Sequence, residues 1–435
     1  MTTLSRPLGV LLALLALAGC SSSNGGSASP EGGAPLDGAT DGPGPNDAGA
    51  SGEGAPAEAG DADAGFVEAP HAALPQIPNN GGPVVAAPKL VTITFAGYSQ
   101  DATMKSFADW IVGSSWFTQV GHDFGVGAGT HVAHVVLQMT APTSPTDLDT
   151  QALIEQKIGD GTLPSPFDVD GGADGGGGGG DAGSGVAGGY VYVLFYPQGT
   201  TAGGFLGGGD TCADLGGGSF IGGYHWETQS GAYHVPYAVV PTCSDASGVE
   251  GASDLEASAS HEIMEASTDP FPYTSTGYAL TDPSNPWTYT DGEVADLCEG
   301  QTLQQNGFTV QRIWSNSAAA AGTAPCIPAP AGGFYDVSPS PNTTQMVAAG
   351  ASTTFTLTGF STAPIPPWSL TTFVGYGTFV PTLQLSTSTI GNGQTATLKV
   401  TVPSTAASQG YASIFVSSSR GLSDFNYWPV AIAVP

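Results

Sequence analysis

The stretch Ser260-His261-Glu262-Ile263-Met264-Glu265-Ala266-Ser267-Thr268-Asp269-Pro270 decides how the rest of the chain is interpreted. Residues 253–256 read Ser-Asp-Leu-Glu, the spacing of a capping box, which predicts a helix from 254 to about 267 that the proline ends. Because successive helical residues are rotated by about 100°, His261 and Glu265 lie one turn apart on the same face. The helix therefore presents an imidazole and a carboxylate to a common point.

Two side chains one turn apart are the means by which a helix supplies two ligands to a metal ion, as in the His-Glu-x-x-His zinc hydrolases. In this chain Glu265 replaces the second histidine, and zinc also accepts carboxylate oxygen. Glu262 has the position of the general base that takes a proton from water in those enzymes. The alternative interpretation is a solvated helix face on which the His-Glu pair arose by chance.

A third ligand is expected from the segment beyond the helix, where Asp291-Gly292-Glu293-Val294-Ala295-Asp296-Leu297-Cys298 adds further carboxylates. We expect zinc to be held by His261, Glu265 and Glu293, with Asp296 as the alternative third ligand.

Composition excludes several classes of function. The chain of 435 residues has 37 acidic and 7 basic residues, so no surface could neutralise a phosphate backbone or dock electrostatically on anionic lipid. We therefore expect no nucleic-acid partner. With 65 glycines and 34 prolines, much of the chain should form turns, linkers and short strands.

The N-terminus has the features of an export signal. Arg6 precedes an apolar run from 8 to 19, which suits a signal peptide over 1–19 and is short for a membrane span. Leu17-Ala18-Gly19-Cys20 resembles the lipobox of bacterial lipoproteins, which implies a lipid on Cys20; an ordinary signal peptide is the alternative. Membrane contact is expected only through this anchor, at the cell envelope and most simply at the outer membrane, on its periplasmic or extracellular face.

The next segment, 20–88, is rich in Gly, Ala, Pro, Ser and acidic residues and contains no basic residue. Such a composition buries too little apolar surface to fold, so we expect a disordered acidic tether.

The segment 89–326 alternates strand and helix patterns. Strands are predicted at 90–98, 131–137, 191–196 and 237–240, and helices at 102–111 and 147–158. This order, followed by the His261 helix, predicts an α/β domain, which we interpret as zincin-like. His131 and His134, three apart on a strand, should point to opposite faces and so form no ligand pair.

A glycine- and aspartate-rich insertion is expected at 168–189. Its aspartates are a weaker alternative cation site, for calcium. They are Asp168, Asp170, Asp174 and Asp181.

Four cysteines remain after Cys20, an even number in an exported chain, which predicts two disulfides. Of the three possible pairings we favour the sequential one, Cys212 with Cys243 and Cys298 with Cys326.

A second domain is expected after a linker at 327–333. The segment 395–402 alternates polar and apolar residues, and shorter strand patterns occur at 353–357, 412–416 and 430–434. We therefore predict an immunoglobulin-like β-sandwich over 334–435.

Several of these motifs together resemble the exordium-like, phosphate-induced family of secreted plant proteins and their bacterial relatives. The matching pieces are Gly223-Tyr224-His225, Ser260-His261-Glu262-Ile263-Met264-Glu265 with Thr268-Asp269-Pro270, and Glu293-Val294-Ala295-Asp296-Leu297-Cys298-Glu299-Gly300. The resemblance covers about residues 90 to 326 and implies a cell-surface or extracellular protein, without an activity. It carries over three sets of residues: the motif itself, the downstream carboxylates, and one further metal ligand as an alternative. They are His261, Glu262 and Glu265 for the motif, Glu293 and Asp296 for the carboxylates, and His225 for the alternative ligand.

Two functions follow as hypotheses. The first is an exported lipoprotein that acts as a zinc-dependent, peptidase-like hydrolase, with Glu262 as the general base. The second is a non-catalytic surface protein that binds glycan or cell-wall material.

Overall fold

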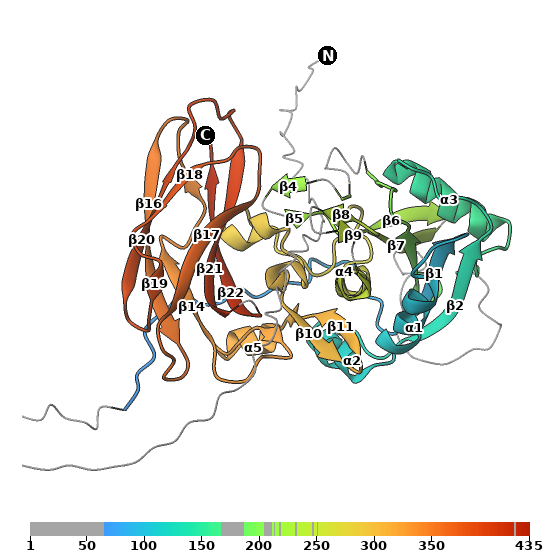
Figure 1. The fold of residues 1–435 in the computed structure, drawn as a ribbon, viewed down its shortest axis with the longest axis horizontal. Coiled ribbons are helices and arrows are strands. Elements are labelled where there is room, and N and C mark those ends of the chain that lie inside the picture. The colour runs from blue at the N-terminus through green and yellow to red at the C-terminus, as the bar shows by residue number, and fades with distance from the viewer. Residues whose placement is uncertain are drawn as a thin grey trace, which may run out of the picture. The chain divides into compact units, whose positions relative to one another are not determined.

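The computed structural model describes residues 65–166, 187–203, 211–230 and 233–435, apart from short gaps at 213, 217–218, 246–247, 250 and 422. From Glu68 to Pro435 these residues belong to one compact unit, in which an α/β part precedes a β-rich part (Figure 1).

The α/β part is built on a five-stranded mixed sheet with the strand order β2-β1-β3-β7-β6. β1 pairs in parallel with β2 and β3, β3 pairs in parallel with β7, and β6 is an antiparallel edge strand on β7. The strands are β1 (Lys89–Phe95), β2 (Thr130–Leu137), β3 (Tyr190–Tyr196), β6 (Tyr224–Ser230) and β7 (Tyr233–Pro241). Four of these five strands coincide with predicted ones, and β6 is the strand that the sequence analysis did not predict.

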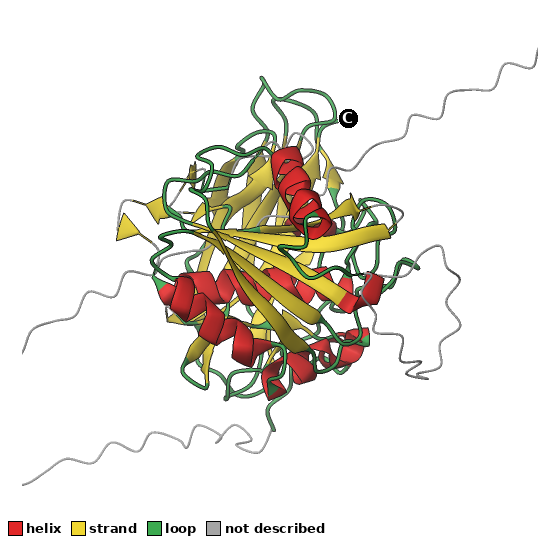
Figure 2. Cartoon of the chain, turned by 90° about the vertical axis from the view of Figure 1, so that its right-hand side faces the viewer, coloured by secondary structure: helices red, strands yellow, loops and turns green. Residues whose placement is uncertain are grey.

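Alternation along the strands divides the core between the two faces of the sheet. In β3, Val191, Val193 and Phe195 join the large cluster that includes α1, α2 and α4, whereas Tyr192 and Leu194 join the cluster that includes α3. Figure 2 shows the resulting layers, with helices on both faces of the strands. The helices are α1 (Asp101–Ile111), α2 (Ser115–Gly121), α3 (Asp147–Gly159) and α4 (Ala252–Thr268).

Helix α4 carries the His-Glu-x-x-Glu motif and is buried along most of its length. The predicted capping box is displaced: the helix is capped at Gly251, whose amide donates to Asp254 (3.1 Å). Glu256, predicted to serve the cap, instead accepts a hydrogen bond from the Thr309 amide (2.7 Å). The cap therefore lies earlier, and Glu256 ties the helix to the segment that follows it.

After α4, the chain forms a series of short helices and strands. β11 packs on α4, and the two disulfides are Cys212–Cys243 and Cys298–Cys326, the predicted sequential pairing. These elements are η3 (Pro286–Thr290), η4 (Asp296–Cys298), β10 (Thr302–Gln305), β11 (Phe308–Gln311), β12 (Ile313–Trp314), α5 (Asn316–Ala320) and β13 (Cys326–Ile327). The disulfides are typical of an extracellular or periplasmic protein.

The prediction that His131 and His134 point to opposite faces of the sheet is wrong. A register shift between Leu90 and Val91 brings both His131 and His134 to Thr92, whose hydroxyl oxygen lies 2.9 and 2.8 Å from their ring nitrogens. The two imidazoles therefore lie on the same side of the sheet, because the bulge breaks the two-residue alternation on which the prediction rested.

The β-rich part consists of two sheets, ordered β14-β16-β20-β18 and β15-β22-β21-β17-β19. All four predicted strands are present, although the predicted ends at 402 and 434 are each one residue too late. The immunoglobulin-like assignment stays a prediction. The strands are β14 (Tyr335–Ser340), β15 (Gln345–Met346), β16 (Ser352–Ser361), β17 (Trp368–Gly377), β18 (Thr382–Leu385), β19 (Thr389–Ile390), β20 (Thr395–Thr401), β21 (Tyr411–Gly421) and β22 (Asp424–Ala433).

The end of the predicted tether is part of the folded unit. Ile77 is 1% exposed and its amide donates to Asn316, while the Ala69 amide donates to Asn392 in the β-rich part. The segment from 68 to 88 therefore contacts both parts of the fold, and the tether prediction extended too far toward the C-terminus.

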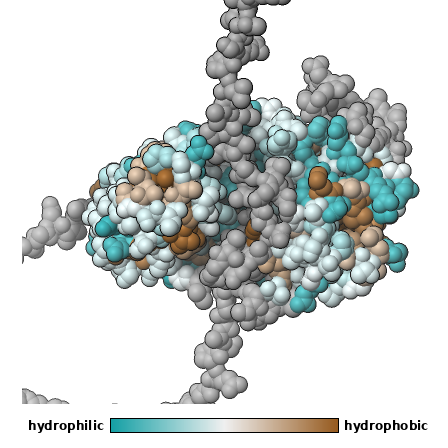
Figure 3. Space-filling model, turned by 90° about the horizontal axis from the view of Figure 1, so that it is seen from above, coloured by the Kyte–Doolittle hydropathy of each residue, from teal (hydrophilic) through white to brown (hydrophobic). Residues whose placement is uncertain are grey.

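The expectations for the signal peptide, Cys20 and most of the tether lie outside the described residues, as do the aspartates of the 168–189 insertion. Within the described part of the chain, no helix is long and apolar enough to cross a membrane. On the face drawn in Figure 3, hydrophilic residues gather over the α/β part and the β-rich part is paler. The remaining elements are η1 (His122–Phe124), η2 (Ala187–Gly189), β4 (Asp214–Gly216), β5 (Ser219–Phe220), β8 (Ser244–Asp245) and β9 (Gly248–Val249).

Candidate metal centre

The predicted site residues converge in the interior, between α4, β6 and the segment around η4. All of them are at most 3% exposed. They are His261, Glu262 and Glu265 on α4, His225 on β6, and Glu293 and Asp296 after η3.

His225 lies at the centre of three carboxylates. Its Nδ1 atom is 3.7 Å from an oxygen of Glu262, 3.6 Å from Glu265 and 3.6 Å from Glu293. These separations are too long for hydrogen bonds, and Nδ1 makes none within the described part of the chain. A fully buried nitrogen is therefore surrounded by acceptor oxygens without contacting any of them directly.

The other nitrogen of the same ring is engaged. His225 Nε2 lies 3.1 Å from the backbone carbonyl of Asp269, to which it can only donate. In the neutral ring, Nδ1 then carries a lone pair that faces the three carboxylates. A histidine that donates one ring N–H to a carbonyl and turns the other nitrogen inward has the arrangement typical of a metal ligand.

The spacing around His225 fits a cation. Four atoms that each lie about 2.1 Å from a tetrahedral ion are about 3.4 Å from one another. The three distances from Nδ1 are close to this value. His225, Glu265 and Glu293 form one group whose ligand atoms lie within 4.8 Å of each other, and Glu262 faces the same nitrogen.

Glu265 is held by both of its oxygens. Oε1 accepts from the backbone amides of Ala295 and Asp296 (3.0 and 3.2 Å). Oε2 lies 2.9 Å from His261 Nε2 and 3.6 Å from His225 Nδ1. This carboxylate therefore links α4 to the downstream segment while one oxygen stays directed at both imidazoles.

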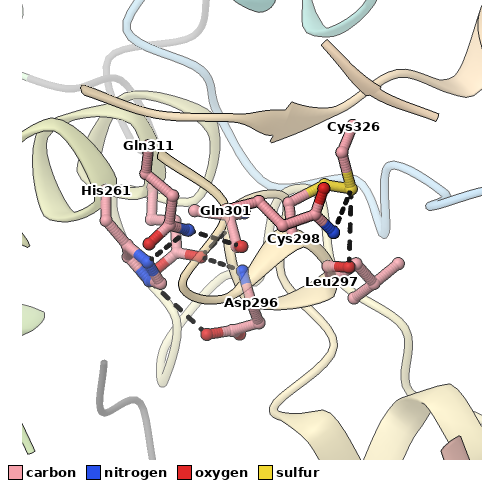
Figure 4. Close-up of a disulfide and its surroundings, with 9 residues drawn as sticks. His261, Asp296, Leu297, Cys298, Gln301, Gln311 and Cys326 are labelled. Atoms are coloured by element: carbon pink, nitrogen blue, oxygen red, sulfur yellow. Dashed lines mark hydrogen bonds and ion pairs between the residues drawn. A yellow bond between two sulfur atoms is a disulfide. The ribbon is translucent and has the colours of Figure 1, made fainter. Parts of the chain in front are cut away.

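His261 sits beside this group in a different environment. Its Nδ1 lies 3.0 Å from the amide nitrogen of Gln311, which also donates to the Ala295 carbonyl (2.8 Å). Its Nε2 is 3.4 Å from Asp296, and Figure 4 shows His261, Gln311 and Asp296 next to the Cys298–Cys326 disulfide. His261, Glu265 and Asp296 form a second group of acceptable metal-ligand types.

Burial of so many acidic side chains shifts their pKa values. Burial raises the pKa of Asp296 to about 7, with a further contribution from the Glu265 charge. Burial likewise raises the pKa of Glu293 and Glu299 well above the usual range. Burial opposes ionisation of Glu265 too, but the neighbouring imidazoles of His261 and His225 lower its pKa.

The same balance acts on His225, where burial disfavours the imidazolium but Glu293 and its neighbours raise the pKa well above the usual range. The cluster therefore retains protons unless a cation supplies the positive charge. Several buried oxygens also make no hydrogen bond in the described structure, among them Glu293 Oε2, Asp296 Oδ1 and Glu299 Oε2. The donor set and these oxygens fit a bound divalent cation.

The structure brings together every residue proposed for the zinc site but groups them differently. His261 and Glu293, expected as ligands of one ion, fall in different groups, and Glu265 belongs to both. The sequence analysis did not identify Gln311 and did not place His225 on a strand. The available signal for that strand was a hairpin pattern, in which stretches rich in aromatic residues lie on either side of 231–232.

A glycine makes room for the motif. A Cβ atom added to Gly223 would lie 2.8 Å from an oxygen of Glu262 and 2.9 Å from the Val239 carbonyl. The absence of a side chain at this position therefore lets β6 and β7 approach the carboxylate of the predicted base.

Comparison with known proteins gives little guidance. No family model matches the chain, and no curated protein matches it. Domains 4 and 5 of the S-layer protein SbsC match with a TM-score of 0.18 and 20% identity, over 24% of this chain and 53% of that chain.

A nucleoside hydrolase-related hypothetical protein from Saccharophagus degradans, associated with carbohydrate metabolism, matches with a TM-score of 0.18 and 14% identity, over 23% of this chain and 26% of that chain. The chain thus spans about half of one structure and a quarter of the other. At these TM-scores the similarities define neither fold nor function.

Proposed function

We propose that the protein is a zinc-dependent hydrolase whose cation is held by His225, Glu265 and Glu293. The observation that carries the proposal is the buried Nδ1 of His225, 3.6 to 3.7 Å from three carboxylate oxygens, with its other nitrogen fixed on a carbonyl. One imidazole and two carboxylates are a ligand set that zinc accepts, and three protein ligands are typical of catalytic zinc sites.

Glu262 is the proposed general base. It precedes the ligand Glu265 by three residues on α4 and faces the same imidazole nitrogen from another side. A zinc ion in such a site makes water more acidic and polarises a carbonyl group. The Glu262 carboxylate would accept the proton of the attacking water and return it to the leaving group.

The setting of the site supports a peptidase-like enzyme at the cell envelope. The mixed sheet packed on the motif helix supports the proposal of a zincin-like fold, and the disulfides support export. We infer a lipid anchor at Cys20 and a peptide substrate from the sequence motifs.

The decisive experiment compares Glu262→Gln with Glu256→Gln in the disulfide-bonded protein, with metal content and peptide hydrolysis measured in parallel. Glutamine at 262 keeps the shape but removes the base, so we expect retained zinc and a loss of activity of about 100-fold or more. Glu256 lies on the same helix but bonds the Thr309 amide, so its variant should retain both zinc and activity. A metal-free wild type, or unchanged activity in Glu262→Gln, would contradict the proposal.

A second candidate function rests on burial. His225 is 0% exposed and Glu262 and Glu265 are 1% exposed, as in structural metal sites, which are closed. In that case Glu262 is a fourth ligand and the protein is a non-catalytic surface protein that binds glycan or cell-wall material. Glu262→Gln would then lower zinc affinity, and the wild type would hydrolyse no peptide.

A further inference from the structure

We infer that His261, the first residue of the motif, is not a metal ligand but a positioning residue that donates a hydrogen bond to the ligand Glu265. This inference rests on the proposed function, because it assigns the remaining imidazole of the same site. The geometry that points to it is the orientation of the Gln311 amide.

The Gln311 amide fixes which ring nitrogen of His261 carries the proton. The two hydrogens of its NH2 group are directed at the Ala295 carbonyl (2.8 Å) and at His261 Nδ1 (3.0 Å). Rotating the amide by 180° would set its oxygen against the Ala295 oxygen, which is repulsive. Nδ1 is therefore an acceptor, so the hydrogen of the neutral ring is on Nε2.

That hydrogen points at the ligand. His261 Nε2 lies 2.9 Å from Glu265 Oε2, a hydrogen-bond distance, and the side chains of both residues are 1% exposed. A nitrogen that carries a proton has no lone pair to offer a cation. The contrast with His225 is direct, since the Nδ1 of that ring stands 3.6 to 3.7 Å from its three carboxylates.

Glu265 is then supported on all sides by donors. The amides of Ala295 and Asp296 hold Oε1, and His261 holds Oε2 with the carboxylate turned toward His225. Such outer contacts orient a ligating carboxylate and typically change metal affinity by about 10- to 100-fold when removed. The His261, Glu265 and Asp296 group is accordingly a hydrogen-bonded support, and the centre takes one ion.

The first test is metal binding by variants of the two histidines, measured as stoichiometry and affinity for zinc in the intact disulfide-bonded protein. His261→Gln, whose amide can still donate near the Nε2 position, should keep one equivalent of zinc with affinity within about 10-fold of wild type. His225→Ala should lose stoichiometric zinc. Loss of zinc from His261→Gln as complete as from His225→Ala would overturn the inference.

The second test needs no variant and no activity. In protein labelled with 15N-histidine, the metal-free form should show His261 as the Nε2–H tautomer, and zinc should perturb His225 while leaving that proton in place. Loss of the Nε2 proton of His261 on zinc addition would overturn the inference. A wild type that binds no zinc but shows this tautomer would overturn the proposed function and support the assignment of His261 as a donor.

The substitution Gln311→Glu tests whether the Gln311 amide determines which ring nitrogen of His261 carries the proton. Gln311→Glu replaces the amide donor by an acceptor, so the His261 proton should move to Nδ1 and the hydrogen bond to Glu265 should be lost. We expect a changed tautomer signal and zinc affinity lowered by about 10- to 100-fold with one equivalent still bound. An unchanged tautomer in Gln311→Glu would contradict the role of the amide.

Discussion

Two clusters in this protein combine the same ingredients, two histidines with carboxylates, and arrange them in opposite ways. Around His225 the imidazole nitrogen stands 3.6 to 3.7 Å from three carboxylate oxygens. Around Thr92, both ring nitrogens of His131 and of His134 have a partner at 2.6 to 3.0 Å. The first spacing suits a cation between the groups, and the second leaves no room for one.

The Thr92 network is a continuous series of hydrogen bonds. It runs from Asp109 through His131, Thr92 and His134 to Asp101, a series of four hydrogen bonds. Each ring nitrogen of the two histidines therefore already has a partner at hydrogen-bond distance within this series.

The comparison teaches that residue types alone do not define a metal site. In the Thr92 network every nitrogen is satisfied by a donor or acceptor at contact distance, so a metal would have to break existing bonds. In the His225 centre, Nδ1 of His225 and several carboxylate oxygens make no such bond in the described structure, so a cation would complete the arrangement.

Metal removal should separate the two clusters most strongly. At a zinc concentration about 1,000 times the dissociation constant, binding should add about 4 kcal/mol to the free energy of unfolding. We expect chelation to remove this amount from wild type and from His131→Ala, but to have no effect on His225→Ala, as measured by denaturant unfolding. Equal sensitivity of wild type and His225→Ala to chelator would place the ion elsewhere.

The disulfide beside the centre provides the next test. Replacing Cys298 and Cys326 by serine should cost about 3.5 kcal/mol in the chain-entropy model, since the bond closes a separation of 28 residues. The Cys212–Cys243 bond spans 31 residues and should cost nearly the same. Because Cys298 follows Glu293 and Asp296 closely, zinc affinity should fall only in the first variant. A similar fall in both would show that the effect is general destabilisation.

A buried acid without an imidazole shows what burial alone does. Asp336 in β14 is 1% exposed, accepts from the Val337 amide (2.8 Å), and burial raises its pKa to about 8. The unfolded value is about 3.9, so the folded state holds this proton more tightly. The associated stability is present below about pH 4 and is lost as the pH rises toward 8.

Asp336→Asn should therefore raise the free energy of unfolding by on the order of 2 kcal/mol at pH 8 and change it little at pH 4. Zinc affinity should be the same as in wild type at both pH values. A gain that is independent of pH would show that Asp336 is not protonated by burial in the fold.

The smallest expected effect concerns the hydrogen-bonded cluster. Thr92→Val removes the hydroxyl that joins His131 to His134 and should cost about 1 kcal/mol, because two partly buried ring nitrogens lose a partner. Zinc stoichiometry and affinity should be unchanged. Reduced zinc binding in Thr92→Val would mean that the two clusters do not act separately.

Much of the scaffold follows from local sequence signals. The apolar run at 191–196 and the alternation at 395–402 form strands, and the His-Glu-x-x-Glu stretch is a helix. These features depend on residues close together in the chain, so periodicity is enough to predict them. The even number of cysteines predicts two disulfides but leaves three pairings, of which the favoured sequential one is present.

The assignment of roles within the centre does not follow from local signals. Whether His225 or His261 faces a cation depends on the Asp269 carbonyl and the Gln311 amide, which lie 44 and 50 residues away from these histidines. The bulge that joins His131 to His134 is likewise a property of the pairing between strands. Spacing along α4 favours His261, and only the tertiary contacts favour His225.

The most direct test of the central claim is a crystal structure of the zinc-soaked protein with anomalous data collected at the zinc absorption edge. The account predicts one anomalous peak about 2.0–2.2 Å from Nδ1 of His225 and from oxygens of Glu265 and Glu293. A peak bonded to Nε2 of His261, or no peak in this cluster, would contradict it.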